Sequence, residues 1–270
     1  MSVRTLLTLL FGVQVLFSST FKILTYNIHA LHPIIAGDSP HLRIPQILNQ
    51  SNQYDFIFLQ ENWIYDSHYL EKHLPGYSFI VSNKSKFPWP LSSLVNSNGS
   101  GLTMAISDRY KITYYHEELF DHCNGWVSSA NDCFASKGFQ HLELNINGQI
   151  VHLYNTHLDA GGSPGDVSTR EKQISHIVNY IEENSVGCSV ILSGDLNVNY
   201  LENEKRALEE LLDALDFNMI DWSAQNPHEK QVLDYILYRG INVTGDLFGI
   251  SSELLGLSDH PPIEATFQIK

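Results

Sequence analysis

The sequence has no cluster of basic side chains. Its 270 residues hold 16 Lys and Arg against 30 Asp and Glu, for a formal net charge of −14 at pH 7 with histidine neutral. A protein that grips nucleic acid neutralises phosphates and normally presents a basic face. Nucleic acid is therefore disfavoured as a partner. A small or membrane-bound phosphodiester remains open, because a metal ion can supply local positive charge.

The chain also lacks a Pro-, Gly- or Ser-rich linker, an internal repeat and a low-complexity run. We therefore expect a single domain over residues 21–270. Residues 1–20 contain one charge, Arg4, then a nearly unbroken apolar run from Leu6 to Phe17 and small residues up to Thr20. This run is short for a membrane span, so we expect a signal peptide and a secreted protein. An uncleaved anchor of similar length is the alternative.

Cysteine is scarce, with three residues in the chain. Cys123 and Cys133 lie close together in a loop-like stretch, and we expect them to pair in an oxidising compartment. Cys188 leads into an apolar run and is expected to be a buried thiol. Asn-x-Ser/Thr sequons, which also arise often by chance, fit a secretory route. They begin at Asn49, Asn83, Asn98 and Asn242.

Strand-like and helix-like apolar patterns alternate along the chain. Strands are predicted at residues 21–27, 55–59, 101–107, 111–116, 139–146, 149–155, 189–193, 232–238 and 263–269, and helices at 41–50, 168–183 and 203–215. Asn147-Gly148 predicts a hairpin turn, and Ser168 or Thr169 is expected to cap the second helix. Hairpins mixed with helices predict packed sheets with helices outside.

Polar side chains end or follow many of these apolar runs. They are Asn27, Glu61, His157, Asp195, Asn197, Asp234, Asp259 and His260. Each residue alone is more often a turn former, a helix cap or a solvated side chain. Strand ends converge at one rim of a sheet, so their recurrence in this context predicts one shared cleft.

Six segments, in chain order, resemble the motifs of the endonuclease/exonuclease/phosphatase superfamily. They are Thr25-Tyr26-Asn27, Leu59-Gln60-Glu61, Asn155-Thr156-His157, Gly194-Asp195-Leu196-Asn197, Leu233-Asp234-Tyr235-Ile236 and Ser258-Asp259-His260-Pro261. The resemblance covers nearly all of residues 21–270. It implies an α/β fold of the deoxyribonuclease-I-like type: a four-layer α-β-β-α sandwich of two packed mixed β-sheets flanked by helices, with the site at one edge.

The resemblance also implies a divalent-metal mechanism. Glu61 would bind Mg²⁺ directly, with Mn²⁺ or Co²⁺ as substitutes, and Asn27 would hold a metal-bound water. His260 would be the general base that takes a proton from the attacking water. Asp234 would orient its ring and support the imidazolium. Asp259 would complete the shell around the metal or the base.

The remaining motif residues would handle the phosphate. Asp195 and Asn197 would position the nucleophile and the phosphate, and His157 would donate to a phosphate oxygen. The segment from Asp132 to Phe139 resembles neutral sphingomyelinases, in which an acidic residue and a lysine five positions on form a switchable pair beside the site. Asp132 and Lys137 would form that pair here, with a chance surface loop as the alternative.

The resemblance thus predicts a secreted, Mg²⁺-dependent phosphodiesterase. It would act as a monomer at a membrane surface and hydrolyse sphingomyelin, or a related choline phospholipid, to ceramide and phosphocholine. One departure is that the stretch from Arg239 to Leu257 has Phe248 as its only aromatic, whereas secreted bacterial sphingomyelinases carry a long aromatic hairpin there. The apolar stretch Phe87-Pro88-Trp89-Pro90-Leu91 could replace it at the bilayer interface.

Three other functions stay open. A secreted deoxyribonuclease-type endonuclease needs the same catalytic set, although the missing basic stripe disfavours it. An inositol-phosphate phosphatase of the same superfamily would meet its anionic substrate with several Lys and Arg, which are missing here. A non-enzymatic toxin subunit or lipid-binding module is disfavoured because all the proposed catalytic positions are filled.

Overall fold

A computed structural model describes residues 19–33, 37–86, 99–125, 132–199, 204–225 and 231–269. Residues 1–18 of the predicted signal peptide and the apolar stretch at residues 87–91 lie outside these ranges, whereas Thr20, the last residue of that predicted peptide, begins the first strand. Within them, no helix is long and apolar enough to cross a membrane.

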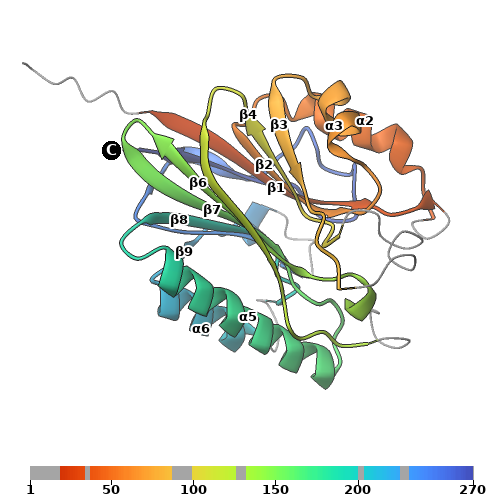
Figure 1. Ribbon diagram of the computed structural model, residues 1–270, viewed down its shortest axis with the longest axis vertical. Coiled ribbons are helices and arrows are strands. Elements are labelled where there is room, and N and C mark those ends of the chain that lie inside the picture. Colours follow the sequence, from red (N-terminus) through yellow and green to blue (C-terminus); the bar gives the residue numbers. More distant parts are fainter. Residues whose placement is uncertain are drawn as a thin grey trace, which may run out of the picture.

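Two six-stranded mixed sheets form the centre of the fold (Figure 1). The first has the order β11 (Asn242–Ile250), β12 (Ile263–Gln268), β1 (Thr20–Ala30), β2 (Phe56–Asn62), β4 (Thr103–Ser107) and β3 (Tyr77–Val81). The second has the order β5 (Ile112–Leu119), β6 (Gly138–Ile146), β7 (Gln149–His157), β8 (Ser189–Asp195), β10 (Asp234–Arg239) and β9 (Asn218–Met219). One parallel pair lies inside each sheet, β1 with β2 and β7 with β8, and the other pairs are antiparallel.

Helices cover the outer faces of both sheets. α2 (Pro40–Gln50) and α3 (Ser67–His73) lie over the first sheet, and α5 (Pro164–Asn184) and α6 (Lys205–Leu215) lie over the second (Figure 1). The short 3-10 turns η1 (Asp132–Phe134) and η2 (Ser223–Gln225) lie in connections. This arrangement confirms the predicted four-layer sandwich.

The alternation of side chains along β1 and β2 explains the layers. Phe56 and Phe58 belong to the larger hydrophobic cluster, which also contains Leu142 and Leu153 of the second sheet. Ile57, between the two phenylalanines, belongs to a second cluster beneath α2 and α3. β1 and β2 therefore supply side chains to two separate cores.

Local signals explain most boundaries. Asn147 and Gly148 both have positive φ, 52° and 92°, as a tight turn between β6 and β7 requires. The predicted start of α5 at residue 168 was wrong, because Ser163 caps the helix in a capping box with Asp166 and Pro164 follows the cap. The edge strands β3, β9 and β11 and the helix α3 were not predicted.

The three cysteines differ in bonding: two form a disulfide and one is free. Cys123 and Cys133 form a disulfide, as predicted. Cys188 is free but only half-buried, so the prediction of a buried thiol was wrong. Cys188 lies between the exposed turn residue Gly187 and Ser189, the first residue of β8, and is therefore still close to the surface.

Candidate active site

The predicted site residues converge at one end of the two sheets. His157 and Asp195 are the last residues of the parallel strands β7 and β8 and are paired in register. Asp234 begins β10 directly opposite Asp195. Asn27 and Glu61 lie near the ends of β1 and β2 in the other sheet. The site is therefore built where the carboxyl ends of parallel strands meet.

Asn27 connects the two sheets through its side-chain amide. Its Nδ2 donates to Glu61 Oε1 at 3.1 Å and to Asp195 Oδ2 at 3.0 Å. Strict alternation would turn Glu61 to the same face as Ile57, but Glu61 has a positive φ of 60°. This left-handed conformation breaks the alternation and allows the carboxylate to face Asn27.

His260 lies beside two buried carboxylates. Its Nδ1 is 2.8 Å from Asp234 Oδ2 and 3.8 Å from Asp195 Oδ2. Burial lowers the pKa of His260, but the charges of Asp234 and Asp195 outweigh it and raise that pKa to about 11. Burial also raises the pKa of Asp195 to about 6, against the lowering effect of the His260 charge. Among the described residues Asp234 Oδ1 has no hydrogen-bond partner, although it is buried.

Lys137 is a buried cation on the other flank of the site. Its Nζ lies 2.5 Å from His157 Nε2 and 3.4 Å from Asp132 Oδ1, and it donates to the Leu158 carbonyl at 3.2 Å. Lys137 is 5% and Asp132 4% exposed, so a solvated surface loop is excluded. Burial and the Lys137 charge hold the pKa of His157 well below its usual range. The His157 ring is therefore neutral, and its buried Nδ1 has no partner in the part of the chain that the structure describes.

Asn197 holds the loop after β8. It has a positive φ of 51°, and its backbone N–H donates to Asp195 Oδ1 at 3.0 Å. Its Nδ2 donates to the carbonyl of Leu158 at 3.0 Å. Asn197 thereby fixes Asp195 and the carbonyl that also accepts from Lys137.

Sequence reasoning missed His29. Its Nδ1 lies 3.3 Å from Glu61 Oε2 and 3.7 Å from Asp259 Oδ2. The hydrogen bond with Glu61 outweighs burial and raises the pKa of His29. Asp259, with a side chain 59% exposed, reaches the rest of the site only through His29 among the described contacts. His29 follows Asn27 by two positions, and its backbone N–H donates to Asn27 Oδ1 at 3.1 Å. A histidine this close to a motif residue in the sequence was the signal that could have indicated it.

Arg43 of α2 ties the loops around His29 together. Its guanidinium donates to the carbonyls of Ile28, His29 and Leu257 and pairs with Asp38 at 2.7 Å. A cavity of about 330 Å³ opens here, lined by His29, Asp38, Arg43 and the residues Gly256, Leu257, Ser258 and Asp259. Asp259, which lines this cavity, directly precedes His260 in the sequence.

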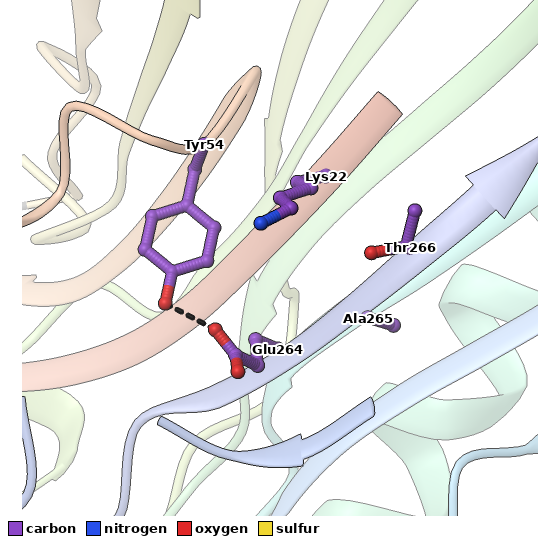
Figure 2. A pocket seen from close by; sticks show the side chains of 5 residues that line it. All are labelled: Lys22, Tyr54, Glu264, Ala265 and Thr266. Carbon is purple, nitrogen blue, oxygen red and sulfur yellow. Dashed lines mark hydrogen bonds between the residues drawn. The ribbon is translucent and has the colours of Figure 1, made fainter. Parts of the chain in front are cut away.

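A second pocket lies away from this end of the sheets. Figure 2 shows it lined by Lys22, Tyr54, Glu264, Ala265 and Thr266, with the Tyr54 hydroxyl donating to Glu264. Lys22 precedes Asn27 by five positions on β1, which is roughly 17 Å along a strand. This pocket does not contact the residues of the site.

The donors at the site fit a hard divalent cation. The pKa of Glu61 is below its ordinary value: burial raises it, but the hydrogen bond from His29, the charge of Lys137 and the hydrogen bond from Asn27 together lower it by more. Glu61 therefore offers an ionised carboxylate, and Mg²⁺ prefers carboxylate oxygen and water. The partnerless Asp234 Oδ1 is a further oxygen acceptor. Ligand atoms of Asp195, Asp234 and His260 also lie within 4.8 Å of one another.

The chain is similar to several known proteins. The profile of the Endonuclease/Exonuclease/phosphatase family matches residues 24–260. A sphingomyelinase of Mycobacterium bovis is 25% identical over 93% of this chain and 53% of its own length. A sphingomyelinase C of Bacillus cereus is 23% identical over 72% of this chain and 61% of its own. The chain thus spans about half the length of the mycobacterial relative.

A solved structure shares the fold. The beta toxin of Staphylococcus aureus, as a mutant with bound magnesium ions, superimposes with a TM-score of 0.65 at 20% identity. The match covers 92% of this chain and 99% of that one. The deoxyribonuclease-I-like sandwich predicted from the motifs is therefore an established architecture for this chain.

Proposed function

Because the chain belongs to the Endonuclease/Exonuclease/phosphatase family, we propose that it is a secreted, Mg²⁺-dependent phosphodiesterase that hydrolyses sphingomyelin, or a closely related choline phospholipid, to ceramide and phosphocholine. The observation that carries the proposal is the 2.8 Å pair of His260 and Asp234 beside the chain of contacts from Glu61 through Asn27 to Asp195. In the proposal, His260 is the base, Asp234 is its orienting carboxylate and Glu61 is the ionised oxygen ligand. That combination suits attack of water on a phosphodiester.

In this mechanism His260 accepts a proton from the attacking water at Nε2, because Nδ1 is held by Asp234. Asp234 fixes the ring and stabilises the imidazolium that forms. Glu61, with Asn27 and Asp259, would hold the cation. Once bound, the cation would neutralise phosphate charge and, as added positive charge, lower the pKa of His260 toward the range of a working base.

Asp195 and Asn197 orient the water and the phosphate from the β8 side. On the opposite flank, Lys137 places an ammonium group at 2.5 Å from His157 Nε2. We propose that Lys137 and His157 together face a phosphate oxygen and stabilise the negative charge that develops on it. The buried Asp132 holds Lys137 in this position.

Two observations favour a choline lipid over the alternatives. The net charge of −14 opposes approach of a long polyanion, whereas a zwitterionic head group meets little repulsion. The relatives at 25% and 23% identity are named sphingomyelinases. A secreted endonuclease and an inositol-phosphate phosphatase would use the same base and the same oxygen ligands, so they remain outcomes of the test below.

The test compares substrates at equal phosphate concentration. Sphingomyelin, lysophosphatidylcholine, phosphatidylcholine, inositol phosphates and DNA are each incubated with the protein and Mg²⁺, with His260→Ala as the matched control. We expect sphingomyelin to be cleaved fastest and DNA to remain intact. Cleavage of DNA without any choline lipid would replace the proposal by a nuclease, and release of inorganic phosphate from inositol phosphates would replace it by a phosphatase.

A further inference from the structure

A cluster of two histidines and one glutamate lies on the outer face of the second sheet, away from the site described above. His141 and Glu143 are two positions apart on β6, so both point to the same face. His152 of β7 is directly opposite Glu143 in the antiparallel register. Directly opposed and diagonal side chains are the pairs that meet across two antiparallel strands.

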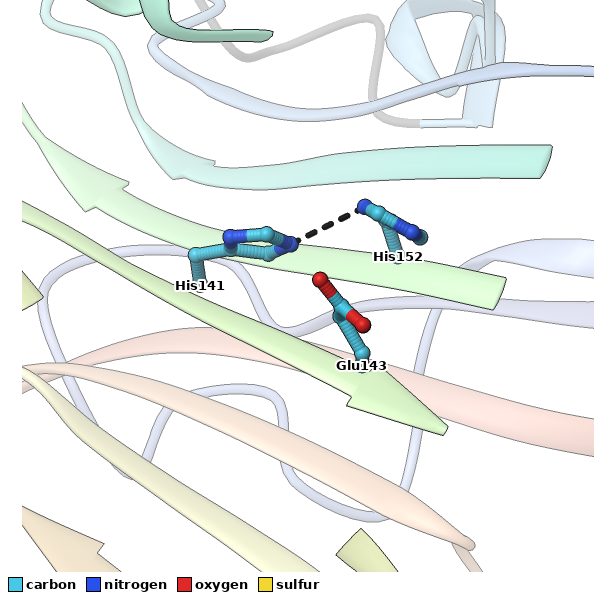
Figure 3. Close-up of side chains that lie close together, drawn as sticks. All are labelled: His141, Glu143 and His152. Atoms are coloured by element: carbon cyan, nitrogen blue, oxygen red, sulfur yellow. Dashed lines mark hydrogen bonds between the residues drawn. The ribbon is translucent and has the colours of Figure 1, made fainter. Parts of the chain in front are cut away.

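The atoms of the cluster are spaced for a common ligand. His141 Nε2 lies 3.0 Å from His152 Nδ1, and ligand atoms of all three residues lie within 4.8 Å of one another. Two imidazole nitrogens bound tetrahedrally to one Zn²⁺ at about 2.05 Å are about 3.3 Å apart, close to the spacing seen here. Figure 3 shows the Glu143 carboxylate pointing toward the two rings.

Hydrogen bonds within the protein do not fully explain the positions of these three side chains. His152 Nδ1 has one in-plane bonding position, yet it faces both His141 at 3.0 Å and Ser185 Oγ at 2.8 Å. Ser185 also has Tyr154 Oη as a partner at 2.6 Å, so it does not depend on His152. The structure gives the half-buried Glu143 carboxylate no hydrogen bond or ion pair among the residues that it describes.

An outer layer of side chains holds the rings in place. His141 lies parallel to the Tyr154 ring, with centroids 4.3 Å apart, and its Nδ1 is 3.2 Å from Tyr180 Oη of α5. Such outer partners orient the imidazoles of metal sites and fix the tautomer. His141 is 0% and His152 3% exposed, so the rings are shielded from water.

From this geometry we propose that His141, Glu143 and His152 form a second metal site, selective for Zn²⁺ over Mg²⁺. Two imidazoles with one carboxylate suit Zn²⁺, whereas Mg²⁺ prefers oxygen ligands alone. His152 precedes His157 by five positions on β7, roughly 17 Å along the strand, so the two sites are separate. A bound ion would cross-link β6 to β7 through these three side chains and thereby stabilise the fold.

The experiment uses the full chain, freed of metal with a chelator and then dialysed against Zn²⁺ in a large excess of Mg²⁺. Bound zinc is counted by mass spectrometry in wild type, Glu61→Gln, Glu143→Gln and His141→Gln. Glu183→Gln is the matched control, because it removes an exposed carboxylate that lies near the C-terminal end of α5 and is not part of the cluster. We expect one Zn²⁺ per chain in wild type, Glu61→Gln and Glu183→Gln.

In Glu143→Gln and His141→Gln, zinc affinity should fall by more than the roughly 10–100-fold that loss of an outer partner costs. The rise in melting temperature that zinc produces in wild type should vanish with it. Glu143→Gln keeps the proposal testable even if the His141 variant does not fold, because Glu143 is only half-buried. The proposal is overturned if wild type binds no zinc under these conditions, or if Glu143→Gln binds it as tightly as Glu183→Gln does.

Discussion

Replacing Lys137 by methionine tests the buried ion pair beside the candidate active site. Methionine keeps the approximate length of the side chain but removes its charge. The side chains of Lys137 and Asp132 are both almost completely buried, and Lys137 Nζ lies 3.4 Å from Asp132 Oδ1. Removing one partner of such a pair leaves an uncompensated buried charge, which costs about 3–5 kcal/mol. We therefore expect Lys137→Met to lose stability as well as sphingomyelin turnover.

Urea unfolding at neutral pH measures the stability part. Asp132→Asn should also be destabilised, because it leaves the ammonium group unpaired. The double variant Lys137→Met/Asp132→Asn buries neither charge, so its loss of unfolding free energy should be clearly smaller than the sum of the two single losses. Turnover should stay low in the double variant, because Lys137 is still absent. Single losses that simply add would refute the coupling, and near wild-type turnover in Lys137→Met would refute its role at the phosphate.

Three further outcomes follow from individual contacts. His260→Ala should lower kcat for sphingomyelin by about 10²–10⁴-fold while vesicle binding persists. Asp234→Asn should lower kcat less, because the base remains. A larger loss of kcat in Asp234→Asn than in His260→Ala would contradict the assigned roles. Cys123→Ser/Cys133→Ser should lower the free energy of unfolding by about 3 kcal/mol in the chain-entropy view for so short a loop; an unchanged denaturation midpoint would count against it. Hydrogen bonds from two histidines outweigh burial and lower the pKa of Glu118 from its ordinary value of 4.5. The stability that Glu118 contributes relative to Glu118→Gln should therefore be present above pH 4.5 and disappear as the pH falls through the lowered pKa; a difference that grows in acid would contradict the sign.

Local sequence signals were sufficient to predict the strands that carry the candidate active site. The runs ending at Asn27, Glu61 and Asp195 are apolar on both faces because both faces are buried, and a polar residue marks where each run stops. Edge strands lack this signal. β11 contains Gly245 and Gly249, and its pairing with β12 is irregular between Val243 and Phe248.

Contacts between distant segments could not be predicted. His29 lies between Glu61 and Asp259 only because the chain near its C-terminal end folds back over β1. The burial of Lys137 depends on Asp132, which also accepts from the Ala160 N–H at 2.7 Å. The motif suggested a pair at these two positions, but a charged loop is usually solvated, so its burial required the tertiary structure.

The most direct test of the proposed activity is sphingomyelin hydrolysis in ¹⁸O-labelled water, with the products analysed by mass spectrometry. Wild-type protein with Mg²⁺ should release phosphocholine that carries one ¹⁸O atom, together with unlabelled ceramide, because water attacks phosphorus and the ceramide oxygen leaves. Chelation should stop the reaction, added Mg²⁺ should restore it, and Glu61→Gln should respond weakly to the metal. Label in ceramide, or phosphocholine release that survives exhaustive chelation, would contradict metal-assisted attack of water on the phosphodiester.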